Sequence, residues 1–251
     1  MSRLTIPRVI KMPVEVQATD VLRDSIISGA IPAGARITEI QLSEQLKLSR
    51  ATIRTALHQL ATEGLLILVP YTGWTVLALS SRDVWELYTL RSAVERLAAQ
   101  LVAKSIDSAK SSRLNWAFDG LVKECKRGET NGIAEADFAL HKTIIQMSDH
   151  KRLGSQYALI EQQIRMYIRS SDALISDIST IVDQHRPIVD SILAGDIEAS
   201  GHLSEQHNLI EGKKLSEHLK LAEEKVDPKA TPTAPAKKKA PKVAEKKSKR
   251  A

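Results

Sequence analysis

The pattern of apolar positions changes character about 80 residues from the start of the chain. Before that point, short stretches with helical spacing alternate with turns. Apolar residues recur with a helical period over residues 14–27, and the glycines and proline of GAIPAGARI then end the pattern. A short helix, EIQLSEQL, and another one that ends at Gly64 follow almost at once. This part of the chain therefore predicts a helix, a turn and two closely spaced helices.

Capping residues and a hairpin signature refine this prediction. Thr38 and Gln41 have the spacing of a capping box at the start of the first short helix, and Ser49 can cap the second. Two β-prone runs, LLILV and WTVLAL, come next and are separated by the turn residues PYTG at 70–73. A winged helix-turn-helix over residues 1–78 accounts for all of these signals.

From Ser80 onward the helical period continues with few interruptions. Ser80 and Asp83 resemble a capping box and open a long amphipathic helix, RDVWELYTLRSAVERLAAQLVAK. Breaks rich in Gly or Asp divide the sequence from there to about residue 221. We therefore expect a mainly α fold, in which residues 79–222 form an all-α bundle of about six helices.

Length and composition limit the class of protein. The chain has 251 residues and a mass of 27.7 kDa, which suits two domains better than one. It contains no run of about 18 apolar residues that could cross a bilayer and no visible secretory signal, so we expect a cytoplasmic protein. Cys125 is the single cysteine, which excludes an intrachain disulfide. Any metal site must then rely mainly on nitrogen and oxygen ligands.

The net charge of +6 is concentrated at the end of the chain. Residues 225–251 carry a net charge of +8 and the rest of the chain −2, while residues 1–80 lean basic at +2. The segment 223–251 is rich in Lys, Pro and Ala, which predicts a disordered tail. This tail could keep the protein soluble, or it could bind nucleic-acid phosphates without reading their sequence.

The first turns of the second short helix carry candidate DNA contacts, because a helix-turn-helix presents this region to the major groove. Here these turns read SRATIRTALHQL. Arg50 and Arg54 lie one turn apart on a face away from Ile53 and Leu57, from which guanidinium groups can reach phosphates or guanine edges. For two arginines alone a solvated helix face is the more ordinary interpretation, but the preceding helix and the following hairpin favour DNA binding.

The segment PAGARITEIQLSEQLKLSRATIRTALHQLATEGLL resembles the N-terminal domain of GntR-type bacterial transcription regulators. The resemblance spans residues 14–78 and implies a double-stranded DNA operator as partner. Two positions depart from the family pattern: Thr55 stands where Glu is common, and Ile40 stands where some members have a DNA-contacting Arg. The residues that the resemblance implies at DNA are Ser49, Arg50, Thr52 and Arg54, with Gly73 at the tip of the wing.

Four residues in the C-terminal half of the chain have the chemistry and spacing of a metal site. Asp137 and His141 lie four apart in one predicted helix, which puts both on the same face. His185 shares a helical face with apolar residues of STIVDQHRPIVDSIL, so its ring should point toward the core and needs a polar partner there. His207 follows on another helix. Three imidazoles and one carboxylate suit a divalent metal, with zinc first and nickel or manganese as alternatives.

The order Asp-x-x-x-His, followed by two histidines 22 positions apart, resembles the effector domain of the FadR-like branch of GntR regulators, called FCD. The resemblance covers residues 81–221 and includes LYTLRSAVERLAA and HRPIVDSILAGDIEASGHLSEQH. It implies that these four residues bind a divalent metal, and that the metal helps to hold a small carboxylate effector. Taken alone, each histidine would more often be a core or surface residue than a ligand.

One cation lies on the inward stripe of the long helix. Arg91 falls in register with apolar residues, whereas Glu86 and Glu95 are expected to project outward. A buried arginine needs an anion. The resemblance implies a place near the effector pocket, where Arg91 would bind a ligand carboxylate; an ion pair with Asp137 or another bundle carboxylate is the alternative. Arg165 is a weaker effector-binding candidate of the same kind.

These features together are typical of a ligand-responsive transcription regulator rather than an enzyme. As a homodimer it would bind a pseudo-palindromic operator, and an effector near the metal would weaken that binding. Repression is the commoner outcome in similar proteins. Two alternatives stay open: a direct metal sensor, and a helical metallohydrolase. The hydrolase is disfavoured because Asp149 and His150 stand in the reverse of the expected His-Asp order and because it leaves the winged domain without a role.

Overall fold

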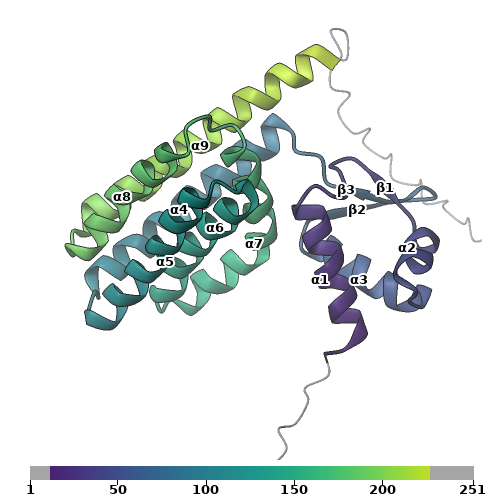
Figure 1. The fold of residues 1–251 in the computed structure, drawn as a ribbon, viewed down its shortest axis with the longest axis horizontal. Coiled ribbons are helices and arrows are strands. Elements are labelled where there is room, and N and C mark those ends of the chain that lie inside the picture. Colours follow the sequence, from purple (N-terminus) through teal and green to yellow (C-terminus); the bar gives the residue numbers. More distant parts are fainter. Residues whose placement is uncertain (1–11, 227–251) are drawn as a thin grey trace, which may run out of the picture.

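The computed structural model describes residues 12–226, and these residues form a small winged domain followed by a helical bundle (Figure 1). The mainly α fold predicted from the sequence is confirmed. The elements of the winged domain are α1 (Val14–Ile27), β1 (Arg36–Ile37), α2 (Glu39–Leu46), α3 (Arg50–Thr62), β2 (Leu66–Val69) and β3 (Gly73–Val76).

Local signals explain where the N-terminal helices begin. Thr38 Oγ1 accepts a hydrogen bond from the Gln41 amide at the start of α2, and Ser49 Oγ accepts one from the Thr52 amide at the start of α3. The sheet is antiparallel with the strand order β1-β3-β2. The strand β1 is absent from the sequence-based prediction, because two residues are too few to show an alternating pattern.

The C-terminal domain is a bundle in which α4 and α9 lie side by side over much of their length (Figure 1). Gly212 on α9 allows the close approach, since a Cβ there would lie 2.4 Å from the Cβ of Tyr88 on α4. The capping box predicted for Ser80 and Asp83 is present at the start of α4. The helices are α4 (Ser81–Lys104), α5 (Ser108–Arg127), α6 (Thr130–Met147), α7 (Lys151–Asp172), α8 (Ser179–Leu193) and α9 (Ile197–Val226).

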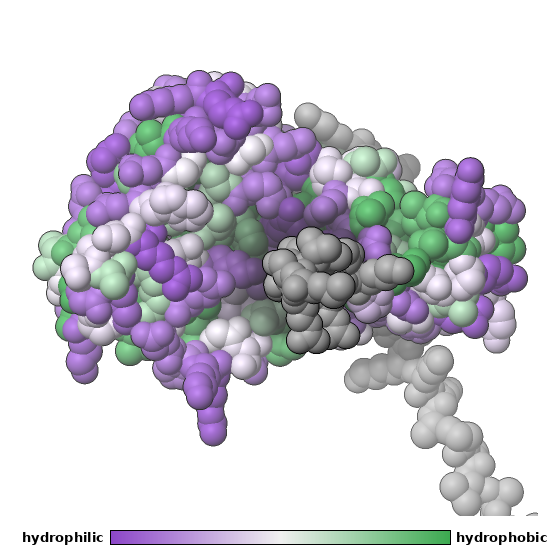
Figure 2. Space-filling view, turned by 60° about the horizontal axis from the view of Figure 1, so that its bottom comes forward, coloured by the Kyte–Doolittle hydropathy of each residue, from purple (hydrophilic) through white to green (hydrophobic). Residues whose placement is uncertain are grey.

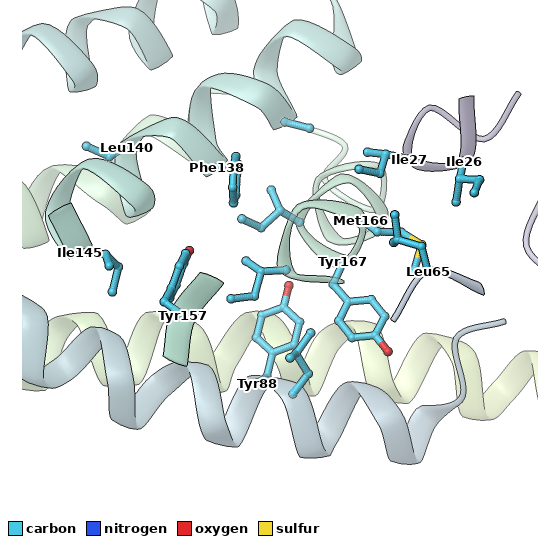
Figure 3. Packing of buried hydrophobic residues seen from close by; sticks show 14 of the residues in the cluster. Ile26, Ile27, Leu65, Tyr88, Phe138, Leu140, Ile145, Tyr157, Met166 and Tyr167 are labelled. Atoms are coloured by element: carbon cyan, nitrogen blue, oxygen red, sulfur yellow. The ribbon is translucent and has the colours of Figure 1, made fainter. Parts of the chain in front are cut away.

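The winged domain packs against α7 of the bundle. Figure 3 shows Met166 of α7 next to Leu65, the residue that precedes β2, and both side chains are buried. Gln163, one turn earlier on α7, donates a hydrogen bond to the Gly64 carbonyl at 3.3 Å. The helix α7 therefore has contacts with the winged domain as well as with the bundle core.

The last helix runs further than the sequence predicts. A disordered tail is expected from residue 223, but α9 continues to Val226, because the stretch KLAEEK consists of good helix formers. The rest of the predicted tail, 227–251, lies outside the described residues. Between residues 12 and 226 no helix combines the length and the apolar character that crossing a membrane needs. On the face shown in Figure 2, hydrophilic and hydrophobic side chains are mixed over both domains.

Candidate functional site

The four residues expected to bind a metal converge inside the bundle. Asp137 and His141 come from α6, His185 from α8 and His207 from α9. One ring nitrogen of each histidine lies within 4.8 Å of those of the other two. The carboxylate oxygens of Asp137 lie 3.3 Å from Nε2 of His141 and 3.3 Å from Nε2 of His185. All four residues are at most 9% exposed, so the group is shielded from water.

Hydrogen bonds behind two of the rings determine which nitrogen carries the proton. His141 Nδ1 lies 2.8 Å from Glu95 Oε2, and His185 Nδ1 lies 2.7 Å from the Ile181 carbonyl oxygen. Both partners are acceptors, so Nδ1 donates and Nε2 of the neutral ring keeps a lone pair. The two Nε2 atoms lie 3.1 Å apart and also face Asp137. Acceptors that face one another in a buried site need a proton or a metal cation between them, and this donor set fits a divalent metal.

Around three of the four residues, the electrostatic environment favours the protonation state that a metal requires. At His141 burial lowers the pKa of the ring, but Glu95 outweighs burial and raises this pKa above its usual value, so a metal would have to displace the added proton. Burial lowers the pKa of His185, and burial together with the two neighbouring rings lowers the pKa of His207 well below its usual value. Burial alone would raise the pKa of Asp137, but His185 and His141 outweigh it and hold this pKa well below its usual range. At neutral pH the site therefore presents neutral imidazoles on α8 and α9 and an ionised carboxylate on α6.

Arg91 forms a buried ion pair with Glu95, which corrects the expectation that Glu95 projects outward. Arg91 Nε donates to Glu95 Oε1 at 2.7 Å. The second oxygen of Glu95 accepts hydrogen bonds from His141 Nδ1 and, at 2.9 Å, from Asn208 Nδ2. Burial would raise the pKa of Glu95, but Arg91 and His141 outweigh it and keep the pKa well below its usual range. Glu95 thus connects the arginine to a histidine of the metal site.

One nitrogen of Arg91 is still available to a ligand. Its Nη2 has no hydrogen-bond partner among the described residues, and Arg91 lines a small cavity of about 10 Å³ together with Asp137 and His207. A groove of about 200 Å³ between α8 and α9 lies beside it and shares Gln184 and Glu211 with the cavity. Arg91 therefore lies next to two of the candidate metal ligands, and it also forms the ion pair with a bundle carboxylate that was the alternative expectation.

Arg165 does not lie at this site. Its Nε donates to Glu135 at 2.7 Å, and its Nη1 lies 3.2 Å from a carboxylate oxygen of Asp24 on α1. These contacts direct the guanidinium toward the winged domain. The effector-binding role expected for Arg165 is therefore corrected to a contact between the two domains. Helical spacing alone could not reveal which face of α7 meets α1.

The arginines expected to read DNA are exposed side by side on α3. Arg54 donates from Nε and Nη2 to the two oxygens of Glu39, each at 2.8 Å, and Arg50 Nη2 lies 3.7 Å from the same carboxylate. The hydrogen bond from Arg54 is the main cause of a lowered pKa of Glu39. The two arginine side chains remain 55% and 60% exposed. One carboxylate at the start of α2 thus holds both groups that are candidates for DNA contact.

The other candidates for DNA contact lie near the start of α3 and in the wing. Ser49 caps α3 and its Oγ lies 3.0 Å from Thr52 Oγ1, so both hydroxyls are at the positive end of the helix dipole. The tip of the wing is Tyr71, which is fully exposed. Gly73 is instead the first residue of β3, which corrects its expected place at the tip. Its φ of 104° favours glycine, and a Cβ there would lie 3.3 Å from the Ile37 carbonyl oxygen.

Three carboxylates with contacts to these sites escape the sequence analysis. Glu95 could be found from its spacing, because it lies four residues after Arg91 on the same helix. Glu39 carries no comparable signal, since its partner Arg54 is 15 residues away. Asp172 lines the small cavity beside Arg91 from the end of α7, and its place depends on how α7 packs in the bundle.

Two protein-family models match the chain. The model described as "Bacterial regulatory proteins, gntR family" matches residues 15–76, and the FCD domain matches residues 86–209. The first range contains the helix-turn-helix and the wing. The second contains all four converging metal-site residues.

Individual proteins resemble the chain over most of its length. A "Probable D-xylose utilization operon transcriptional repressor" from Paenarthrobacter nicotinovorans is 29% identical over 205 residues, which are 81% of this chain and 89% of that protein. An HTH-type transcriptional regulator in the TAR-I ttuE-ttuC' intergenic region of Agrobacterium vitis is 30% identical over 127 residues, 49% of this chain and 74% of that protein. The solved structure of E. coli McbR/YncC has a TM-score of 0.70 at 18% identity, covers 83% of this chain and 99% of that one, and shows the same fold.

Proposed function

Since the chain belongs to the GntR family of bacterial regulatory proteins and carries an FCD domain, we propose that it is a repressor controlled by a small carboxylate at a metal-containing pocket. Family membership makes it a DNA-binding transcriptional regulator and not an enzyme, which excludes the metallohydrolase alternative. The protein would act on DNA in the cytoplasm. A direct metal sensor is the competing function that the experiment below separates.

The convergence of buried acceptors on α6, α8 and α9 carries the proposal. Asp137, His141, His185 and His207 would hold the metal, with zinc first and nickel or manganese as alternatives. A bound divalent ion would supply positive charge that attracts an anionic ligand. Without a metal cation or an added proton, the two Nε2 lone pairs and the carboxylate would repel one another in a buried site.

Arg91 would bind the carboxylate of the effector. Its Nε is held by Glu95, and its unpaired Nη2 belongs to a side chain that lines the cavity beside the metal ligands. A guanidinium fixed on one edge is well oriented to donate from the other edge. Glu95 would act as a positioning residue, because it orients both Arg91 and His141.

The helix α7 would carry the signal to the winged domain. Its last residue, Asp172, lines the cavity, while Met166 and Arg165, about two helical turns earlier, contact the winged domain. A ligand that shifts the end of α7 would therefore change how the winged domain is held. Such a shift changes DNA affinity only if the ligand binds more tightly to one position of the winged domain than to the other.

DNA binding would use the start of α3 and the wing in two copies. Arg50 and Arg54, with the hydroxyls of Ser49 and Thr52, would contact base edges and phosphates, and the backbone at Gly73 would support the wing. A homodimer would place two such helices about one DNA turn apart on a pseudo-palindromic operator. The exposed Leu90 and Leu97 lie seven residues apart on α4, and such an apolar stripe suits a contact between two copies.

The proposal can be tested by fluorescence anisotropy on an operator duplex located by footprinting. Zinc-loaded protein is titrated onto the duplex with and without millimolar acetate, propionate, glycerate, gluconate or succinate. We expect at least one acid to weaken binding of the wild type and to have no effect on His185→Ala. The response should survive in His202→Ala, which removes an exposed histidine of α9 outside the pocket. Operator affinity that follows zinc alone, with no response to any acid, would support the direct metal sensor and refute the proposal.

A further inference from the structure

The cavity beside the metal ligands is surrounded by polar groups with unfilled hydrogen-bonding capacity. Tyr88 Oη, Arg91 Nη2, Asp137 Oδ1 and Asp172 Oδ2 are buried and have no well-aligned hydrogen-bond partner within the described residues of the chain, and all four residues line this cavity. Buried polar atoms are nearly always hydrogen-bonded. Asp137 belongs to the proposed metal site, and Arg91 to the proposed carboxylate site. Tyr88 and Asp172 are left without a role.

The neighbouring acidic side chain, Glu211, is already satisfied. One of its oxygens accepts a hydrogen bond from Ser171 Oγ at 2.9 Å, and the other accepts one from Lys214 Nζ at 2.8 Å. Asp172 is 8% exposed and makes no comparable contact through Oδ2. Outside the proposed metal ligands, Asp172 is therefore the open hydrogen-bond acceptor among the described residues of this cavity, while Arg91 and Tyr88 are open donors.

The surroundings of Asp172 also disfavour a second anion. Asp137 and Glu211 line the same cavity, so the negative charges of two other carboxylates act on Asp172. The same negative field would act on a ligand carboxylate placed beside Asp172. A hydroxyl or an ammonium group avoids this repulsion, and either can donate to Oδ2.

We propose that Asp172 forms a second subsite, which selects effectors that carry a hydroxyl or ammonium donor in addition to one carboxylate. The ligand would lie in the groove between α8 and α9, and the adjoining cavity of about 10 Å³ would widen so that the carboxylate reaches Arg91 and the donor reaches Asp172. Simple monocarboxylates leave Asp172 unpaired, and dicarboxylates put a second negative charge beside it. This inference rests on the proposed function, and it narrows the effector class.

Isothermal titration calorimetry of the zinc-loaded full chain tests the inference with four matched acids. Propionate carries only a carboxylate, glycerate adds hydroxyls, β-alanine adds an ammonium, and succinate adds a second carboxylate. We expect glycerate or β-alanine to bind at least about tenfold more tightly than propionate, and succinate to bind no more tightly than propionate. The better of the two donors identifies whether hydroxyl or ammonium is preferred.

Variants then assign the preference to Asp172. Asp172→Leu should remove the advantage of the better donor-bearing acid over propionate, so that the two acids bind with similar affinity. Asp172→Asn preserves the shape of the side chain and should also reduce the preference for the donor-bearing acid. This variant replaces the leucine variant if the latter does not fold. The control Asp190→Leu alters an exposed aspartate on α8 and should keep the preference.

The outcomes separate this inference from the proposed function. Equal binding of propionate, glycerate and β-alanine, tightest binding of succinate, or a preference that persists in both Asp172 variants would overturn the subsite while leaving a carboxylate effector in place. No binding of any acid to the zinc-loaded wild type would overturn the proposed function, and the subsite with it.

Discussion

Two arginine–glutamate pairs, one in each domain of the molecule, have nearly the same hydrogen-bond length and very different surroundings. On the winged domain, Arg54 contacts Glu39 at 2.8 Å and the arginine side chain is 55% exposed. In the bundle, Arg91 contacts Glu95 at 2.7 Å and both side chains are at most 3% exposed. The first pair is open to exchange with an incoming anion, while the second is fixed in place.

The difference in solvent exposure determines how easily each arginine can exchange its glutamate for another anion. An exposed ion pair contributes little to stability, so DNA phosphates or bases can replace Glu39 at small cost. A buried pair cannot lose one partner without leaving an uncompensated charge. Under the proposed function, Arg91 would bind a ligand with one edge of its guanidinium while Glu95 keeps the other edge occupied.

The largest effect is expected from Glu95→Ala. This change leaves Arg91 buried without its anion and removes the acceptor of His141, so unfolding free energy should fall by about 3–5 kcal/mol. Metal affinity of the protein that still folds should fall by about 10–100-fold. Chemical denaturation and a competitive zinc titration measure the two effects. A loss of stability no larger than that of Glu39→Ala would break the comparison.

Arg54→Ala should affect DNA binding and not stability. Its guanidinium is exposed, and we expect operator affinity to fall by about tenfold to a hundredfold while Tm stays unchanged. Anisotropy on the operator duplex and differential scanning calorimetry measure the two quantities. Arg127→Ala, which removes an equal charge from an exposed arginine on α5, is the matched control. Similar losses of affinity in both variants would mean that net charge, not α3, determines binding.

Arg165→Ala separates the two arginines that the sequence predicts to bind the effector, Arg91 and Arg165. The contacts of Arg165 with Glu135 and Asp24 predict that its loss leaves acid affinity unchanged, whereas Arg91→Ala abolishes acid binding. Calorimetric titration with the tightest-binding acid measures both. A decrease in acid affinity in the Arg165 variant would contradict its position outside the pocket.

The smallest effect is expected from Glu39→Gln. Removing the charge that holds Arg50 and Arg54 should raise affinity for operator and random duplexes alike, by a few-fold at low salt, with little change in Tm. Parallel anisotropy titrations on the two duplexes provide the measurement. If only operator binding changes, and it weakens, then Glu39 contributes to reading the sequence.

Much of this architecture follows from local signals in the chain. The capping residues Ser49 and Ser80 and the glycine-rich breaks predict where helices begin and end, and the spacing of Asp137 and His141 predicts a shared face. Local signals do not predict the role of a residue when that role depends on packing between distant segments of the chain. Glu95 looks like a surface residue because charged side chains are rarely buried without a partner, and its spacing of four from Arg91 is the one local signal of the pair. Arg165 faces the winged domain for a reason that only the tertiary contacts of α7 reveal.

The central claim is that three histidines and one aspartate hold a divalent metal inside the bundle. Inductively coupled plasma mass spectrometry on purified protein, compared between His207→Ala and His202→Ala, tests it most directly. His202 lies on the same helix but is exposed, which makes it a matched control. The account predicts one divalent ion per chain in the wild type and in His202→Ala, and a loss of metal in His207→Ala. Equal metal content in the two variants, or a wild type that cannot be loaded, would contradict it.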